Sequence, residues 1–471
     1  MRVELYKKYF KNKRVTMMGL GLLGRGIGDA LFLAPLVKEL LITDKKTEDE
    51  LKSSIQTLRE KLSIHDFNKI KFVLGEHREE DFVNTDMVMK SAGVPLDSMY
   101  IQIAKENNIP IYMSAALVTK IIYDNSTQEN NKLANVKVIG VTGTRGKSTT
   151  TMMIHNMLTV AGKRVHLGGN VRGVANLPLL DYIEDGDYLL MELDSWQLQG
   201  FGDLQISPGI AVFTSFLDDH LNYYKGDREA YFADKANIFL YQNEADKLII
   251  SKDVENKINK FCTNNNIKRN IFMSNSFLQN MNLIGHHNQV LAGLVNEVGI
   301  QLGLDYNDIA KGISSFKAVE GRLQYMGKFN LINKNNKTDL KSTIEIYNDN
   351  NATTPDATIA AIRSVIEKYK KKPILLLGGA DKGLDLTLLE REIKERTKAY
   401  VLLAGTGTDI LQTEKTNIYD RLEDAVARTF EMAENDDIFL YSPGFASFSK
   451  YFKNEYEKND EFVRCVNKYK I

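Results

Sequence analysis

Apolar positions along this chain fall into short, nearly continuous runs, and the longer segments between these runs repeat their apolar residues at helical spacing. A continuous apolar run is typical of a strand that is buried on both faces of a parallel sheet. Alternation of such strands with helices predicts an α/β fold with helices on both faces of each sheet.

The strand-like runs form three blocks. A polar linker at residues 123–131 separates the first block from the second, and the third begins near Glu320. With 471 residues, the chain has room for about three domains of ordinary size. We therefore predict domains at 1–122, 132–319 and 320–471. The runs behind this prediction are 14–19, 40–44, 71–74, 87–90 and 109–112, then 136–139, 187–195 and 210–214, and finally 373–379, 400–405 and 438–442.

A glycine-rich segment, GVTGTRGKSTT at residues 140–150, lies between a strand-like run and a helix-like run. In this order the glycines let backbone N–H groups turn toward a phosphate, and the start of the helix adds partial positive charge. Lys147 would reach the β- and γ-phosphates, and the Ser148 hydroxyl can hold Mg²⁺. The strict phosphate-loop pattern expects a glycine where Val141 stands, and a chance GKS turn is the alternative. The flanking strand and helix favour a site for ATP or GTP.

A second glycine motif, Gly19-x-Gly21-x-x-Gly24-x-Gly26, follows the first strand-like run. The next such run ends in Asp44, twenty residues after Gly24. This is the layout of a dinucleotide-binding βαβ unit, in which the acid meets a ribose or sugar hydroxyl. A glycine-rich turn with a purely structural role is the alternative.

Acidic residues at the ends of two further strand-like runs extend the predicted nucleotide site. Glu192 ends one run, and the pair Asp219-His220 follows another. Carboxylates at such strand ends beside a phosphate loop commonly hold Mg²⁺. Without that loop, Glu192 reads equally well as a surface residue. Lys235 lies on an amphipathic helix, and its immediate neighbours indicate only a surface lysine.

Charge and cysteine content exclude several classes of protein. Lys plus Arg equals Asp plus Glu at 61 each, so net charge points neither to nucleic acid nor to an anionic membrane surface. Two cysteines, Cys262 and Cys465, are too few for a disulfide framework and lack metal-ligand spacing. The N-terminus has no apolar signal region, and no apolar run reaches about 18 residues. We expect a cytoplasmic protein with no membrane insertion.

Taken together, the motifs of this chain resemble those of the Mur ligases, over essentially its whole length. Within that family it is most similar to the members that add D-glutamate to UDP-N-acetylmuramoyl-L-alanine, as judged by the tail Ser442-Pro443-x-x-Ala446-Ser447-Phe448. The other matching motifs are Gly143-Thr144-x-Gly146-Lys147-Ser148-Thr149, Gly168-Gly169-Asn170, Glu192-Leu193-x-Ser195, Asp219-His220-Leu221, Ala233-Asp234-Lys235, Gly285-x-His287-Asn288, Arg322, Asn348-Asp349 and Gly378-Gly379-x-Asp381-Lys382-Gly383.

The resemblance implies three domains: a Rossmann-like N-terminal domain, a P-loop ATPase-like central domain and a Rossmann-like C-terminal domain. It also assigns roles to individual residues. The UDP-sugar would be bound by Leu22, Leu23, Asp44, Lys45, Lys46, Ser91, Gly93 and Asn170. The nucleotide would be bound by Gly143, Thr144, Arg145, Gly146, Lys147, Ser148, Thr149, Asn288, Arg322 and Asp349. Mg²⁺ would be held by Ser148, Glu192, His220 and a carbamylated Lys235. The amino acid would be bound by Thr353, Lys382, Ser447 and Phe448, and catalysis would rest on Lys147, Lys235, His220 and Arg322.

The implied activity is ATP-dependent, ADP-forming amide ligation through an acyl phosphate, by a monomer that needs Mg²⁺. Some positions depart from the family pattern, among them Arg145, Asp194, Leu291, Asn351 and Glu455, and the last two are expected near the amino-acid pocket. The alternatives are a sister ligase for another amino acid, a nicotinamide-dependent oxidoreductase, and a nucleotide-binding protein without turnover.

Overall fold

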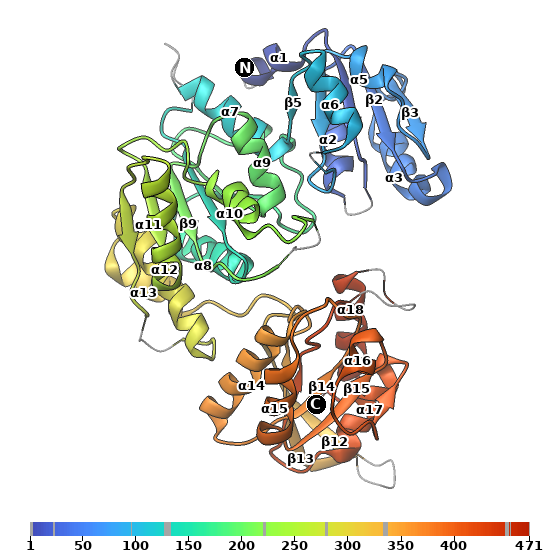
Figure 1. Cartoon of the computed structure of the whole chain (residues 1–471), viewed down its shortest axis with the longest axis vertical. Coiled ribbons are helices and arrows are strands. Elements are labelled where there is room, and N and C mark those ends of the chain that lie inside the picture. Colours follow the sequence, from blue (N-terminus) through green and yellow to red (C-terminus); the bar gives the residue numbers. More distant parts are fainter. Residues whose placement is uncertain are drawn as a thin grey trace. The chain divides into compact units, whose positions relative to one another are not determined.

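The computed structural model describes residues 3–21, 24–95, 97–126, 133–219, 223–277, 281–332, 338–447, 452 and 454–470 (Figure 1). The chain forms two compact units. One comprises Met1–Ser276 with Leu291–Ile313, and the other comprises Phe277–Val290 with Ser314–Ile471. The first unit holds two sheets and the second holds one. Within the described residues, no helix is both long and apolar enough to span a bilayer.

The first sheet is wholly parallel, with the strand order β3-β2-β1-β4-β5. The chain runs outward from β1 to β3 and then returns to place β4 on the other side of β1. Ligands commonly bind at such a reversal, beyond the carboxyl ends of the strands. The bounds are β1 Arg14–Met18, β2 Glu39–Asp44, β3 Ile70–Leu74, β4 Met87–Lys90, β5 Ile111–Tyr112, α1 Val3–Phe10, α2 Arg25–Leu33, α3 Glu48–Lys61, α4 Ile64–Phe67, α5 Glu80–Val83, α6 Met99–Glu106 and α7 Ser114–Ser126.

The second sheet is also parallel, with the order β11-β10-β9-β6-β8-β7, so β6 again marks a reversal. The predicted glycine-rich segment follows β6, as a nucleotide site requires. The bounds are β6 Lys137–Thr142, β7 Val165–Gly169, β8 Tyr188–Glu192, β9 Ile210–Phe213, β10 Lys247–Ile250, β11 Ile271–Met273, α8 Lys147–Val160, η1 Leu177–Asp181, α9 Ser195–Asp203, α10 Arg228–Ala236, η2 Lys252–Val254, α11 Glu255–Asn264, α12 His286–Gln301 and α13 Tyr306–Ser314.

The third sheet has the order β12-β13-β17-β14-β15-β16 and contains one antiparallel pair, β12 with β13. The pattern of continuous apolar runs does not predict this pair, because both strands mix charged and apolar residues. The bounds are β12 Gln324–Ile332, β13 Thr338–Asn348, β14 Ile374–Leu377, β15 Ala399–Leu403, β16 Ile418–Tyr419, β17 Ile438–Tyr441, α14 Pro355–Tyr369, α15 Thr387–Arg396, α16 Thr406–Ile410, α17 Leu422–Met432 and α18 Glu455–Asn467.

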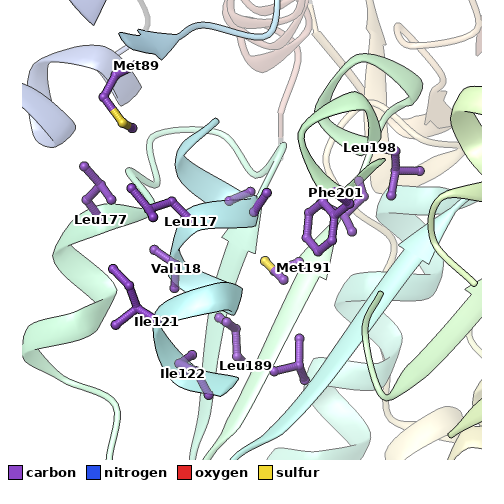
Figure 2. Packing of buried hydrophobic residues seen from close by; sticks show 14 of the residues in the cluster. Met89, Leu117, Val118, Ile121, Ile122, Leu177, Leu189, Met191, Leu198 and Phe201 are labelled. Carbon is purple, nitrogen blue, oxygen red and sulfur yellow. The ribbon is translucent and has the colours of Figure 1, made fainter. Parts of the chain in front are cut away.

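Helix α7 joins the first two sheets into one core. Its residues Leu117, Val118, Ile121 and Ile122 are all buried, and Figure 2 shows them between β8 and the residues of η1. Met89 of the first sheet belongs to the same cluster. Full burial of each such side chain contributes about 1.5–3 kcal/mol. The carboxyl ends of β1 and β8 are therefore held in one packed body.

Candidate active site

The loop after β6 requires glycine at two positions. Gly143 has a φ of +146°, and a Cβ at this position would lie 2.0 Å from the Thr214 hydroxyl oxygen. Gly146 has a φ of +86° and stands directly before the first residue of α8. The loop therefore brings its backbone N–H groups to the start of a helix, which is the geometry that binds phosphate.

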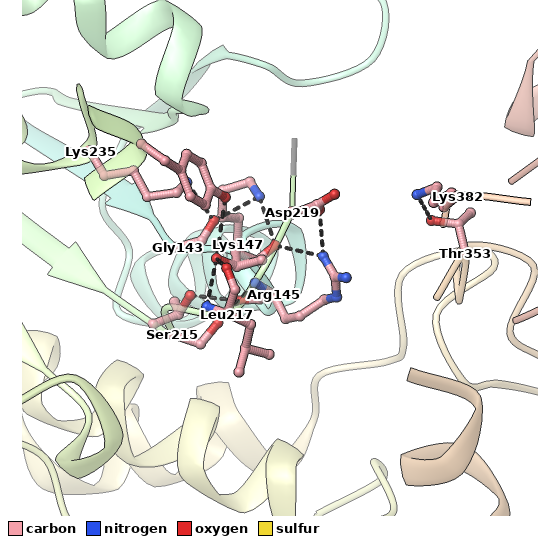
Figure 3. Close-up of polar contacts among 12 residues, drawn as sticks. Gly143, Arg145, Lys147, Ser215, Leu217, Asp219, Lys235, Thr353 and Lys382 are labelled. Carbon is pink, nitrogen blue, oxygen red and sulfur yellow. Dashed lines mark hydrogen bonds and ion pairs between the residues drawn. The ribbon is translucent and has the colours of Figure 1, made fainter. Parts of the chain in front are cut away.

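This phosphate loop is fastened to the segment that follows β9. The backbone N–H of Thr144 donates to the Ser215 carbonyl at 2.8 Å, and that of Arg145 donates to the Ser215 hydroxyl at 2.8 Å. The Thr144 hydroxyl donates to the Leu217 carbonyl at 3.1 Å. An ion pair between Arg145 and Asp219, 2.7 Å from Nη1 to Oδ2, adds a side-chain link (Figure 3).

Two lysines meet at one carbonyl of the loop. The Nζ atoms of Lys147 and Lys235 lie 2.9 Å and 3.0 Å from the Gly143 oxygen, and Figure 3 shows them approaching it from different elements. Lys235 is only 1% exposed. Burial, and secondarily the charge of Lys147, lowers the pKa of Lys235 well below its usual value.

The surface-lysine interpretation of Lys235 is therefore wrong. Lys235 follows Tyr231 by four positions and Phe232 by three, so all three occupy one face of α10, and all are buried. This spacing was the signal available in the sequence. Lysine is so rarely buried that its position on the apolar face of a helix does not by itself predict burial.

Glu192 is 6% exposed and pairs in register with Val141, next to the phosphate loop, so it is not the surface residue that the alternative allowed. Asp194 caps α9, its carboxylate accepting the Gln197 N–H at 2.8 Å. His220 lies outside the described residues. Among those that are described, no three His, Cys, Asp or Glu side chains converge as metal ligands.

A cavity of about 860 Å³ opens between the first and second sheets. This size is suited to a small-molecule ligand. Across its wall, the Arg25 guanidinium donates to the Asn170 side-chain oxygen at 2.7 Å. Of the residues predicted to bind the UDP-sugar, Leu22 and Leu23 lie outside the described residues. The others all line the cavity: Asp44, Lys45, Lys46, Ser91, Gly93 and Asn170.

Asp44 also supports the glycine turn. Its carboxylate accepts the N–H groups of Leu20 at 3.0 Å, Gly21 at 3.3 Å and Lys46 at 3.0 Å. The structural alternative for this motif thus describes part of what Asp44 does. The same residue lines the cavity, so the two roles coexist.

Polar groups of the second unit gather at the carboxyl ends of β13, β14 and β17. Asp349 is buried, and its carboxylate accepts the Leu323 N–H at 2.9 Å and the Ser442 hydroxyl at 2.9 Å. Burial raises the pKa of Asp349 to about 7, although these hydrogen bonds and Arg322 oppose the shift. Asn288, also buried, donates to the Ile284 carbonyl at 2.8 Å.

The predicted amino-acid site lies on three segments of the second unit, two of which pair with each other through Ala380 and Ala446. Lys382 donates to the Thr353 hydroxyl at 3.1 Å (Figure 3). The Ser447 hydroxyl is buried and has no hydrogen-bond partner among the described residues. A buried hydroxyl without a partner is costly, which is consistent with a ligand-binding role. Phe448 lies outside the described residues.

Two further lysines, which the sequence motifs do not single out, are buried in the structure. Lys90 ends β4 and lines the cavity, and Lys458 of α18 lies 3.4 Å from the Gly378 carbonyl. Each is 3% exposed. Burial lowers the pKa of Lys90 to about 8 and that of Lys458 to about 7. For Lys90, the available signal was a lysine that closes an otherwise apolar strand.

Comparison with known proteins agrees with this geometry. Residues 141–334 match the family model described as the Mur ligase middle domain. A UDP-N-acetylmuramoylalanine–D-glutamate ligase of Borreliella afzelii is 32% identical, over 97% of this chain and 98% of its own. A protein with the same description from Roseiflexus is 30% identical, over 97% and 99%.

Solved structures share the fold. UDP-N-acetylmuramate-alanine ligase from Thermotoga maritima matches with a TM-score of 0.57 and 15% identity, over 97% of this chain and all of that one. MurF ligase from the same organism, in complex with ADP, matches with a TM-score of 0.57 and 15% identity, over 93% and 98%. The α/β architecture with N-terminal, central and C-terminal parts is thereby confirmed.

Proposed function

This chain belongs to the Mur ligase family, and we propose that it joins D-glutamate to UDP-N-acetylmuramoyl-L-alanine in an ATP-dependent, ADP-forming reaction. The observation that carries the proposal is the convergence of Lys147 and Lys235 on the carbonyl oxygen of Gly143, in a loop built for phosphate. We assign acceptor binding to residues 1–122, ATP binding to 132–319 and amino-acid binding to 320–471. ATP and sugar nucleotides are cytoplasmic compounds, so we place the enzyme there.

The reaction has two steps. An oxygen of the acceptor's terminal carboxylate forms a bond to the γ-phosphorus of ATP, while the bond from that phosphorus to ADP breaks. The amine nitrogen of D-glutamate then bonds to the acyl carbon, and inorganic phosphate and a proton leave. Both steps concentrate negative charge at the transferred phosphoryl group, so fixed positive charge is the main contribution that the protein can make.

Lys147 is the group best placed to supply that charge. It already lies on the phosphate loop, with its ammonium held by the carbonyls of Gly143 and Thr144. Arg145 adds a second cation on the same loop. From the second unit, Arg322 would bind the nucleotide beside Asp349.

Lys235 would serve in a different chemical form. A neutral lysine amine attacks CO₂ to give a carbamate and a proton, and burial beside Lys147 favours the neutral amine. The carbamate would be a carboxylate-like ligand next to the loop. Together with Ser148, Glu192 and His220 it would hold Mg²⁺, which screens the phosphate charge when bound.

In the amino-acid site, Lys382 would pair with a carboxylate of D-glutamate, while Thr353 and Ser447 would donate neutral hydrogen bonds. A fixed set of polar groups rejects analogues that leave those groups unpaired. The unpartnered Ser447 hydroxyl supports this assignment.

Phosphate release from ATP, measured with a panel of UDP-muramyl acceptors and amino acids, tests the proposal. We expect release only when UDP-N-acetylmuramoyl-L-alanine and D-glutamate are both present. A markedly faster reaction with L-lysine or L-alanine would keep the ligase class and reject the proposed amino acid. Absence of release with every pair would favour a nucleotide-binding protein without turnover.

A further inference from the structure

Lys90 is a buried cation in the wall of the cavity, and the roles assigned above leave it without a function. It is the last residue of β4, pairs in register with Met18 of β1, and is 3% exposed. An ammonium that is removed from water must find acceptors or lose its charge. The hydrogen-bond acceptors of its ammonium therefore show which part of the structure Lys90 stabilises.

Those acceptors belong to a single turn. Lys90 Nζ donates to the Val94 carbonyl at 2.7 Å and to the Ser91 carbonyl at 3.4 Å. The turn, residues 91–95, is closed by the Val94 N–H, which donates to Ser91 at 3.1 Å. Ser91, Gly93, Val94 and Pro95 all line the cavity. The lysine thus fixes the shape of one cavity wall.

The same turn contacts the glycine motif of β1. The Ser91 N–H donates to the Met18 carbonyl at 3.1 Å, and the Ser91 hydroxyl lies 2.5 Å from the point that a Cβ on Gly19 would occupy. In βαβ units this is where a diphosphate approaches the backbone. An ammonium carries three N–H groups, and carbonyls of the described residues take two of those on Lys90.

Charged groups on three elements surround Lys90. Asp203 of α9, Asp194 at the cap of that helix and Asp234 of α10 favour its charged form, while Lys105 of α6 disfavours it. Burial outweighs these acids, so the ammonium loses its proton near pH 8. A bound phosphate would return it to the charged form.

We propose that Lys90 is a positioning residue for the acceptor, whose buried ammonium holds the turn at residues 91–95 and presents its third N–H to a phosphate oxygen of the nucleotide. The proposal rests on the assignment of this cavity to a sugar nucleotide. It adds the Lys90 ammonium, at the end of β4, to the groups that would bind the diphosphate.

Trp196 gives a direct binding signal, because it is the only tryptophan in the chain and it lines the cavity. Its fluorescence can follow titration of the full-length protein with UDP and with uridine. Lys90→Met should weaken UDP binding about 10-fold or more, as loss of a charge-assisted hydrogen bond does, and leave uridine binding unchanged. Lys90→Arg should restore part of the UDP affinity, and Lys52→Met, at an exposed lysine of α3, should match the wild type.

The pH dependence of UDP binding, compared between the wild type and Lys90→Met, provides a second measurement. UDP affinity should be constant from pH 7 to 7.5 and fall as pH rises through about 8, because binding needs the charged lysine. This fall in UDP affinity should be absent in Lys90→Met. If the fall in UDP affinity persists in that variant, or if the variant binds UDP as tightly as the wild type, the proposal is wrong. An equal loss of UDP and uridine affinity also overturns it, since the phosphate would then have no special part.

Hydrogen exchange without ligand separates this proposal from the proposed function. The Ser91 and Val94 amides should exchange faster in Lys90→Met than in the wild type or in Lys52→Met. Unchanged exchange rates of these amides would show that Lys90 does not stabilise the turn. Failure of the ligase assay together with phosphate-dependent UDP binding would reject the proposed reaction and leave the role of Lys90 standing.

Discussion

Lys147 and Lys235 donate to one acceptor, the carbonyl oxygen of Gly143, from 2.9 Å and 3.0 Å. Two ammonium groups on one oxygen repel each other, and only Lys235 is fully buried. Burial, and then the charge of Lys147, lowers the pKa of Lys235 well below its usual value. The neutral amine is thereby favoured at Lys235, beside a second lysine that lies on the phosphate loop itself.

Replacing Lys147 with alanine should remove the fixed cation without disturbing the fold. We expect turnover to fall by about 10²-fold or more, the scale on which a single preorganised charge acts in catalysis. Phosphate release and the thermal midpoint measure the two effects, with Lys52→Ala as the exposed-lysine control. Near-normal turnover in Lys147→Ala would remove the basis for placing ATP at this loop.

Substitutions of Lys235 distinguish a role for its positive charge from a role for its carbamate. Lys235→Ala should be almost inactive, and added small carboxylates such as formate or acetate should restore part of the turnover by filling the place of the carbamate. Lys235→Arg keeps a cation but cannot form a carbamate, so it should be inactive and insensitive to these anions. A fully active Lys235→Arg enzyme would contradict the proposed carbamate.

Lys382→Ala should weaken only the amino-acid step. Its ammonium lies 3.1 Å from the Thr353 hydroxyl and would bind a carboxylate of D-glutamate. We expect the KM for D-glutamate to rise by about 10-fold or more, as charge-assisted hydrogen bonds imply, with the KM for the sugar nucleotide unchanged. Lys394→Ala, at an exposed lysine of α15, is the control. Equal increases in both KM values would place Lys382 elsewhere in the mechanism.

Asp349 makes the stability of the second unit depend on pH. Its folded pKa of about 7 lies above the ordinary 3.8, so the folded state holds a proton that the unfolded chain has lost. Stability from this group is complete below about pH 4, falls as pH rises toward 7 and is level above that. Calorimetry from pH 4 to 8 should show this fall in the wild type.

Asp349→Asn should flatten this dependence, because an amide has no proton to lose in that range. The change at pH 8 should be a gain of about 1–2 kcal/mol in unfolding free energy, because the amide avoids the cost of a buried carboxylate but accepts weaker hydrogen bonds from Leu323 and Ser442. Asp409→Asn, at an exposed acid, should keep the wild-type slope. An unchanged slope in Asp349→Asn would mean that another group titrates.

Strands were predictable where burial on both faces leaves a continuous apolar run. The runs at 87–90, 210–214 and 438–442 became interior strands of their sheets, with every residue of the strand buried. The antiparallel pair of β12 and β13 was not predictable in this way, because polar residues interrupt both strands and because the other neighbour of β13 is β17, far along the sequence. Short-range pattern does not carry such long-range pairing.

The candidate site was predictable where backbone shape dictates the residue. Gly143 must be glycine because the Thr214 hydroxyl occupies the space of a Cβ. A constraint of this kind appears in the sequence as the glycine itself. For Lys235 and Lys90 the sequence offers only weak local signals, because the burial of both lysines is completed by elements far away in the chain. Resemblance supplied a role for Lys235, and only the fold shows that its amine is removed from water.

With Arg145 at the proposed nucleotide site, its guanidinium would be shared between a phosphate and the Asp219 carboxylate, 2.7 Å away. Any loss of that ion pair would lower the affinity for bare nucleotide, and a divalent cation that arrives with the phosphates would compensate the carboxylate. Free nucleotide and its metal complex should thus differ in affinity at this loop, which would then discriminate between them before any chemistry begins.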